Sequence, residues 1–175
     1  MVPWPIPIPP RSPFTLANLP YGVFSITAKV SLYSLASRCG WIATTLQDEK
    51  HVGVAIGDFI IDLSTLERCC LDEMIIKSLK HWSKDPLFQD GDLAKFASMP
   101  AVTRREWRET LISWLNDPKS PLFDNTARNA AIFVAMQDAI MHLPFVIRAF
   151  TDFMCADVHI ENVSGQPPLY PCTVL

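Results

Sequence analysis

The sequence predicts a mixed α+β fold, made mainly of strands with added helices. Apolar and small residues alternate in two short runs, at 52–56 and 59–63, which Gly57-Asp58 separates. Further along, tryptophan and leucine recur at helical spacing between residues 104 and 115. Alternation with a period of two is typical of a strand with one buried face, and spacings of three and four are typical of an amphipathic helix.

Composition limits the classes of protein to consider. The 175 residues are 49% hydrophobic and 19% charged, which is typical of a globular chain with room for one domain, or one domain and part of another. The net charge is −3 without a basic cluster, so no nucleic-acid or membrane partner is expected. The five cysteines lack metal-ligand spacing, which favours reduced thiols and a cytoplasmic location.

Residues 1–13 begin with prolines that alternate with apolar residues. Proline fixes φ and removes the amide donor, so we expect a disordered, extended arm. It lacks the basic start and unbroken apolar run of a signal peptide. Pro7 and Pro10 also have the spacing of a PxxP ligand, although a loosely ordered terminus is the simpler interpretation.

From residue 14 the chain leads through Pro20-Tyr21-Gly22 into a predicted strand. The following stretch, 26–50, is mildly apolar without steady periodicity, and Arg38 and Gly40 interrupt it. Its apolar run, 30–46, is too short for a bilayer span of about 20 residues. A membrane or partner segment and an inserted loop are the alternatives, of which we favour an irregular insertion.

The two alternating runs are predicted to form a β-hairpin. Glycine at the first central position suits a type II′ turn, so the chain should reverse at Gly57-Asp58. The period then changes, and Asp72 can cap a helix with an apolar face of Met74, Ile75, Leu79 and Trp82. A further short helix is expected near Leu93 and Phe96.

The most regular helix is predicted from about Arg104 to Leu115. Thr103 and Glu106 have capping-box spacing at its start, and Pro118 follows its end. The side chains expected to be buried are Trp107, Leu111 and Trp114. A loop should follow at 118–127, whereas periodicity leaves helix or strand open for 130–141. His142 is interpreted as structural, with its imidazole satisfied by backbone.

A candidate site lies near the end of the chain. Asp152 follows a threonine, and His159 comes seven residues later. A carboxylate can bind a hard cation through oxygen, and a neutral imidazole can take a proton from water. The alternative is an Asp that caps a turn and a solvent-facing His.

Three stretches, in the same order, resemble the fumarylacetoacetase family. They read NLPYGVFS at 18–25, GVAIGD at 53–58 with IDLS at 61–64, and MHLPFVIRAFTDF at 141–153 followed by His159. The resemblance covers roughly residues 14 to 163 and implies the family's small SH3-like barrel at 14–145. It also implies the first piece of a catalytic domain at 146–175, with the rest of that domain absent from this chain.

The resemblance assigns roles to three positions. Asp152 matches a calcium ligand and His159 the general base, whereas Met154 replaces a tyrosine that contacts substrate. The implied reaction is calcium-assisted hydrolysis of a carbon–carbon bond in fumarylacetoacetate, giving fumarate and acetoacetate in tyrosine and phenylalanine catabolism. Magnesium is a further ion implied for the complete enzyme.

The resemblance also implies partners. The substrate is a small-molecule β-diketo acid, and the family forms homodimers, although this chain alone is expected to be monomeric. Its own calcium binding should be weak and its activity absent, because one carboxylate supplies only part of the 6–8 oxygen ligands of calcium. The alternative is a non-catalytic binding domain that remains after loss of the catalytic half.

Overall fold

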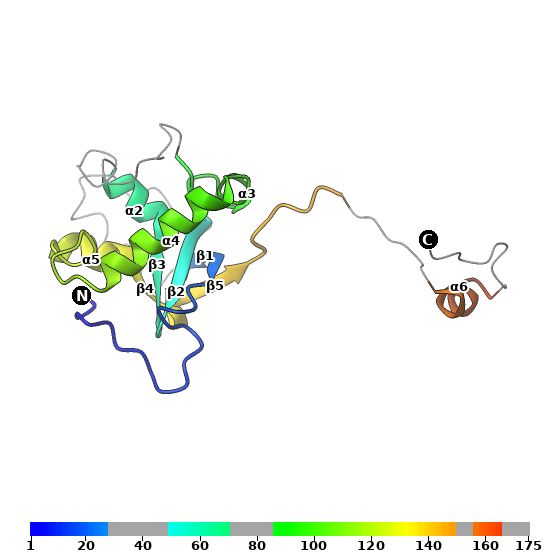
Figure 1. Cartoon of the computed structure of the whole chain (residues 1–175), viewed down its shortest axis with the longest axis horizontal. Coiled ribbons are helices and arrows are strands. Elements are labelled where there is room, and N and C mark those ends of the chain that lie inside the picture. Colours follow the sequence, from blue (N-terminus) through cyan, green and yellow to red (C-terminus); the bar gives the residue numbers. More distant parts are fainter. Residues whose placement is uncertain (28–48, 71–85, 150–155, 166–175) are drawn as a thin grey trace.

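The computed structural model describes residues 1–27, 49–70, 86–149 and 156–165. The strands are β1 (Tyr21–Ile26), β2 (His51–Ile56), β3 (Phe59–Asp62), β4 (Phe133–Ala135) and β5 (Ala139–His142). The helices are α2 (Leu63–Cys70), α3 (Ala94–Ala97), α4 (Ala101–Leu115), α5 (Thr126–Ile132) and α6 (Asp157–Ser164), with the 3-10 turn η2 at Met136–Asp138. Figure 1 shows one body of strands and helices, with α6 apart from it. The mixed class of strands and helices is confirmed.

The strands form one antiparallel sheet in the order β4-β3-β2-β1-β5. Its central hairpin pairs Ile56 with Phe59 and turns through Gly57-Asp58, as predicted. Gly57 has a φ of +57°, and Arg11 is the one non-glycine residue with positive φ in the described part of the chain. Asp58 therefore keeps an ordinary φ, and this combination fits the predicted II′ turn.

The stretch from 130 to 141, for which periodicity left helix or strand open, contains both. Helix α5 ends where Phe133 adopts an extended conformation, and β4 begins there against β3. After η2 the chain returns as β5, which pairs with β1 from Val23–His142 to Ile26–Ala139. Strands more than 110 residues apart in the sequence therefore lie side by side.

Helix α4 is longer than predicted. It begins at Ala101 after Pro100, and the Arg104 N–H donates the first helical hydrogen bond to the Pro100 carbonyl, at 3.1 Å. No side chain caps this end, and Thr103 lies inside the helix, so the predicted capping box is wrong. Proline has no N–H to be satisfied and a fixed φ, which suits a helix start. Trp107 and Leu111 are buried as predicted, together with Leu115, and Trp114 is partly buried.

Apolar clusters lie on both faces of the sheet. Alternation along β2 places Val52, Val54 and Ile56 in one cluster with Trp107 and Leu111 of α4. Helix α4 lies across the front of the sheet in Figure 1, in agreement with this packing. The smaller cluster on the opposite face consists of Phe24, Ile26, Ile60 and Val134.

The N-terminal arm, which was expected to be disordered, docks on the body instead. The Val2 N–H donates to the Asn129 side chain at 2.7 Å, and the Trp4 indole donates to the Leu115 carbonyl at 3.2 Å. Val2 is itself buried in the main apolar cluster. These contacts overturn the expectation, because the arm's apolar residues find partners on α4 and α5.

Some predictions fall outside the described residues. The helix capped by Asp72 lies in the range 71–85, and most of the irregular insertion lies in 28–48. The short helix near Phe96 is confirmed as α3. Among the described helices none is both long and apolar enough to span a bilayer.

Candidate functional site

The predicted site is described only in part. Asp152 and Met154 lie outside the described residues, whereas His159 lies in the first half of α6. The structure therefore does not show whether Asp152 and His159 come together. What it does show is the local environment of the His159 imidazole.

Helix α6 presents His159 to solvent. The backbone N–H of His159 donates to the Ala156 carbonyl at 3.0 Å, which closes the first turn of the helix. Gly165 ends the helix at a φ of 66°. The His159 side chain is exposed, as are Glu161 and Asn162. No hydrogen bond to its ring comes from the described part of the chain. Nothing among the described residues therefore fixes the tautomer of this imidazole.

A calcium site is also not formed by the described residues. Among them no group of three His, Cys, Asp or Glu side chains lies close enough to hold a metal ion. Calcium requires several oxygen ligands, so Asp152 would have to be joined by ligands from elsewhere. The residues that the structure describes therefore do not fit this ion by themselves.

The described body contains a buried polar cluster that sequence reasoning missed. The Nδ1 atom of His51 lies 2.8 Å from Oδ2 of Asp62, and the two side chains are 2% and 1% exposed. Asp62 also accepts from the Thr65 N–H at 2.9 Å and from its hydroxyl at 2.6 Å. The carboxylate therefore caps the start of α2 while it contacts the imidazole.

The outer edge of this cluster is charged. Glu49 lies 4.0 Å from Nε2 of His51 and accepts from Arg68 at 2.9 Å. Although the His51–Asp62 distance is short, the ring N–H is not aligned for a hydrogen bond. Neither ring nitrogen has a hydrogen-bond partner among the described residues. A pair this deeply covered cannot receive a substrate, so we interpret it as structural.

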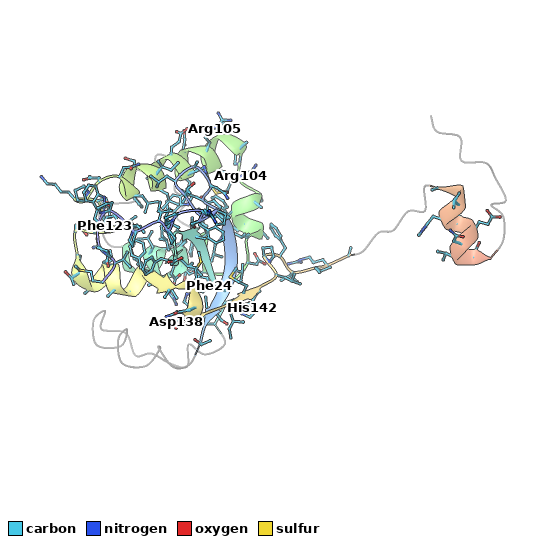
Figure 2. The ribbon with its side chains drawn as sticks, turned by 90° about the horizontal axis from the view of Figure 1, so that it is seen from below. Phe24, Arg104, Arg105, Phe123, Asp138 and His142 are labelled. Carbon is cyan, nitrogen blue, oxygen red and sulfur yellow. The ribbon has the colours of Figure 1, made fainter. Side chains whose placement is uncertain are left out.

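A second histidine joins two strands. Nε2 of His142 on β5 lies 2.9 Å from Oγ of Ser25 on β1, so the partner is a hydroxyl and not the backbone that was expected. In the described part of the chain no carboxylate contacts this imidazole, so the pair lacks the third member of a nucleophilic triad. Figure 2 labels His142 at the edge of the sheet where the chain leaves for residues 143–149.

Tyr21 has a strongly perturbed side chain. Burial raises the pKa of its phenol well above the usual range, and the Arg108 guanidinium partly offsets that effect. The hydroxyl has no hydrogen-bond partner among the described residues, and the ring lies 4.8 Å from that of Phe96. A phenol held neutral in this way is a packing residue and not a base.

Comparison with known proteins decides the family. The family described as Fumarylacetoacetase N-terminal matches residues 17–144. The fumarylacetoacetase of Caenorhabditis elegans is 31% identical over 158 residues, and that of Homo sapiens is 30% identical over 158 residues. In both cases the match covers 90% of this chain and 32% of the relative. The chain belongs to the fumarylacetoacetase family. It corresponds to the N-terminal region of that family.

The chain spans about a third of the length of the fumarylacetoacetases that it matches. The match nevertheless reaches beyond residue 144. The match covers 158 of the 175 residues, so at most 17 residues can follow it and it must extend at least to residue 158. It therefore contains position 152 wherever it begins. The candidate calcium ligand therefore lies inside the region shared with fumarylacetoacetases.

One signal in the sequence, the predicted hairpin, points toward the buried pair. The hairpin that turns at Gly57-Asp58 places Gly53 opposite Asp62, so His51 and Asp62 lie diagonally on one face. A buried carboxylate favours polar neighbours, and the diagonal position brings the His51 ring within contact distance of it. The Ser25–His142 contact has no such local signal, because it joins strands 117 residues apart.

Proposed function

We propose that this chain acts as the N-terminal part of a fumarylacetoacetase-type hydrolase. The activity would be cleavage of the carbon–carbon bond of fumarylacetoacetate to fumarate and acetoacetate, in tyrosine and phenylalanine catabolism. The observation that carries the proposal is the match to fumarylacetoacetases, which extends through position 152. The chain contributes about a third of the relatives' length, so the rest of the active site belongs to the remainder of the enzyme.

In this proposal His159 is the general base and Asp152 is one oxygen ligand of a calcium ion. His159 takes a proton from the water that adds to the substrate carbonyl. The carbon–carbon bond then breaks, and the leaving carbon takes up a proton. The exposure of His159 supports a role that is completed by another part of the enzyme, which would cover the imidazole and fix its tautomer.

The proposal includes a division of the chain. Residues 14–145 form the family's SH3-like barrel in this proposal, which is supported by one antiparallel sheet of five strands in which β1 pairs with both β2 and β5. Residues 146–175 begin the catalytic domain. Met154 stands where the family resemblance expects tyrosine, so we expect weaker substrate affinity than in the relatives.

The test uses the chain joined in one polypeptide to the unmatched remainder of the Caenorhabditis elegans relative. Asp152→Ala should raise the calcium dissociation constant about tenfold or more, since a direct ligand matters at least as much as its supporting residues. His159→Ala and the control Asn162→Ala, which alter exposed side chains of the same helix, should leave it within about twofold. Met154→Tyr should lower KM.

Two outcomes would contradict the proposal. One is unchanged calcium affinity in Asp152→Ala with the protein fully folded. The other is fumarylacetoacetate hydrolysis by the 175-residue chain alone, because its described residues form neither a metal site nor an oriented base. Unchanged affinity would leave the non-catalytic binding domain as the function to pursue.

A further inference from the structure

Half of the exposed large apolar side chains in the described part of the chain lie within eight consecutive residues. We name them the β5 strip. They are Ile140, Met141, Leu143, Phe145, Val146 and Ile147, with exposures from 47% to 72%. Scattered apolar residues are normal on a protein surface, whereas a contiguous group marks an interaction site.

The β5 strip carries almost no charge. Between residues 139 and 149, Arg148 is the one Lys, Arg, Asp or Glu. A charged partner would therefore find few opposite charges on the strip, whereas an apolar partner surface could pack against most of it. This argues against an acidic or basic peptide and in favour of a packed interface.

The start of the strip is held in a fixed position. β5 pairs with β1 over four residues, and His142 contacts the Ser25 hydroxyl at 2.9 Å. The Leu93 N–H donates to the Pro144 carbonyl at 2.9 Å, which ties the following segment to the start of α3. The Met141 methyl lies 2.9 Å from the position a Cβ at Gly22 would occupy, so the glycine leaves room for it. A surface ordered in advance loses less entropy when a partner binds.

We propose that the β5 strip is the docking surface for the remaining two-thirds of a fumarylacetoacetase-type polypeptide. The N-terminal family match ends at residue 144, inside the strip, and the chain covers 32% of its relatives. The matches to those relatives run on through position 152, so the strip lies between the N-terminal region and the unmatched remainder, which can fold back on it. This docking role rests on the proposed function, because it requires a larger catalytic part as the occupant.

The proposal is tested by hydrogen exchange of residues 143–149 in two proteins. One is the 175-residue chain, and the other is its fusion to the unmatched remainder of the Caenorhabditis elegans relative. Exchange should slow by about 100-fold in the fusion, as expected when amides that open freely become part of a stable unit. Exchange around Val102, an exposed apolar residue of α4 far from the strip in sequence, should change by less than about twofold.

Matched variants identify the surface. In the fusion, Phe145→Glu and Ile147→Glu should restore fast exchange at 143–149, whereas Val102→Glu should not. Fast exchange in the unsubstituted fusion would overturn the proposal. So would a 175-residue chain that sediments as a dimer with 143–149 already protected, because the occupant would then be a second copy.

Turnover by the same fusion separates this proposal from the proposed function. Protection of 143–149 without hydrolysis of fumarylacetoacetate supports the docking surface and counts against the hydrolase. Hydrolysis without protection shows that the catalytic part is complete but lies elsewhere, and overturns the docking surface.

Discussion

The Nδ1 atom of His51 lies 2.8 Å from Oδ2 of Asp62, and both side chains are almost fully covered. The same carboxylate caps α2 through Thr65. Strand β2, strand β3 and helix α2 therefore meet at one acidic side chain. Asp62 therefore connects three elements of the body.

Asp62→Ala should lower the free energy of unfolding by about 2–4 kcal/mol, because it removes a helix cap and leaves His51 buried without its neighbour. The control is Asp58→Ala in the exposed turn of the same hairpin, which should cost less than about 0.5 kcal/mol. Denaturant unfolding of both variants checks this. Equal stability of the two would show that the buried contact contributes nothing.

Glu67 holds a second segment of the body. Its buried carboxylate accepts from the N–H groups of Leu87 and Phe88, at 2.6 and 3.0 Å, and from the Gln89 amide at 2.8 Å. Glu67→Gln keeps the shape of the side chain but places its N–H₂ group against a neighbouring N–H donor. The substitution should therefore lower the free energy of unfolding by about 1–3 kcal/mol. Glu109→Gln, on the exposed side of α4, is the matched control and should be neutral in the same unfolding measurement.

Asn129 anchors the N-terminal arm through the N–H and carbonyl of Val2. Asn129→Ala should destabilise the protein by about 1–3 kcal/mol, since it leaves buried polar groups without partners. It should also speed tryptic cleavage after the exposed Arg11 several-fold, because the arm loses its anchor. Mass spectrometry of the digest measures this rate. Asn162→Ala on α6 should leave it unchanged.

Tyr21 makes stability depend on alkaline pH. Burial raises the pKa of its phenol in the folded state, so the unfolded state loses its proton first, near pH 10. Stability from this residue is complete below that pH and is lost as pH rises further. The wild-type free energy of unfolding should decline above pH 10, and Tyr21→Phe should reduce the decline. At pH 7 the same variant should be neutral or slightly stabilising, because the hydroxyl has no partner among the described residues.

The hairpin and α4 could be predicted because their signals are local. Gly57 supplies the positive φ that the turn requires, and Trp107 and Leu111 recur at helical spacing. The start of α4 was misplaced because Pro100 begins the helix without a side-chain cap, whereas Thr103 only has the spacing of one. At this helix start, the proline and the capping-box spacing predict different first residues, and the spacing alone does not decide which of them begins the helix.

The arm and the site could not be predicted in the same way. The position of Val2 depends on Asn129, 127 residues away, and no periodicity records that contact. For the site, the sequence indicates Asp152 and His159 as candidates seven residues apart. It does not show whether the two side chains lie close together, because that depends on how the surrounding chain folds. The described helix leaves His159 exposed, so its role depends on what covers it.

The central claim is that His159 acts as the base of a fumarylacetoacetase-type site once the remainder of the enzyme is present. The most direct measurement is the rate of fumarylacetoacetate hydrolysis by the fusion with and without His159→Ala, at equal folding and equal calcium affinity. We expect kcat to fall by about 100- to 10,000-fold, the usual contribution of general-base catalysis. A His159→Ala fusion that hydrolyses the substrate at the unsubstituted rate would contradict the claim, and His159 would then be a surface histidine of α6.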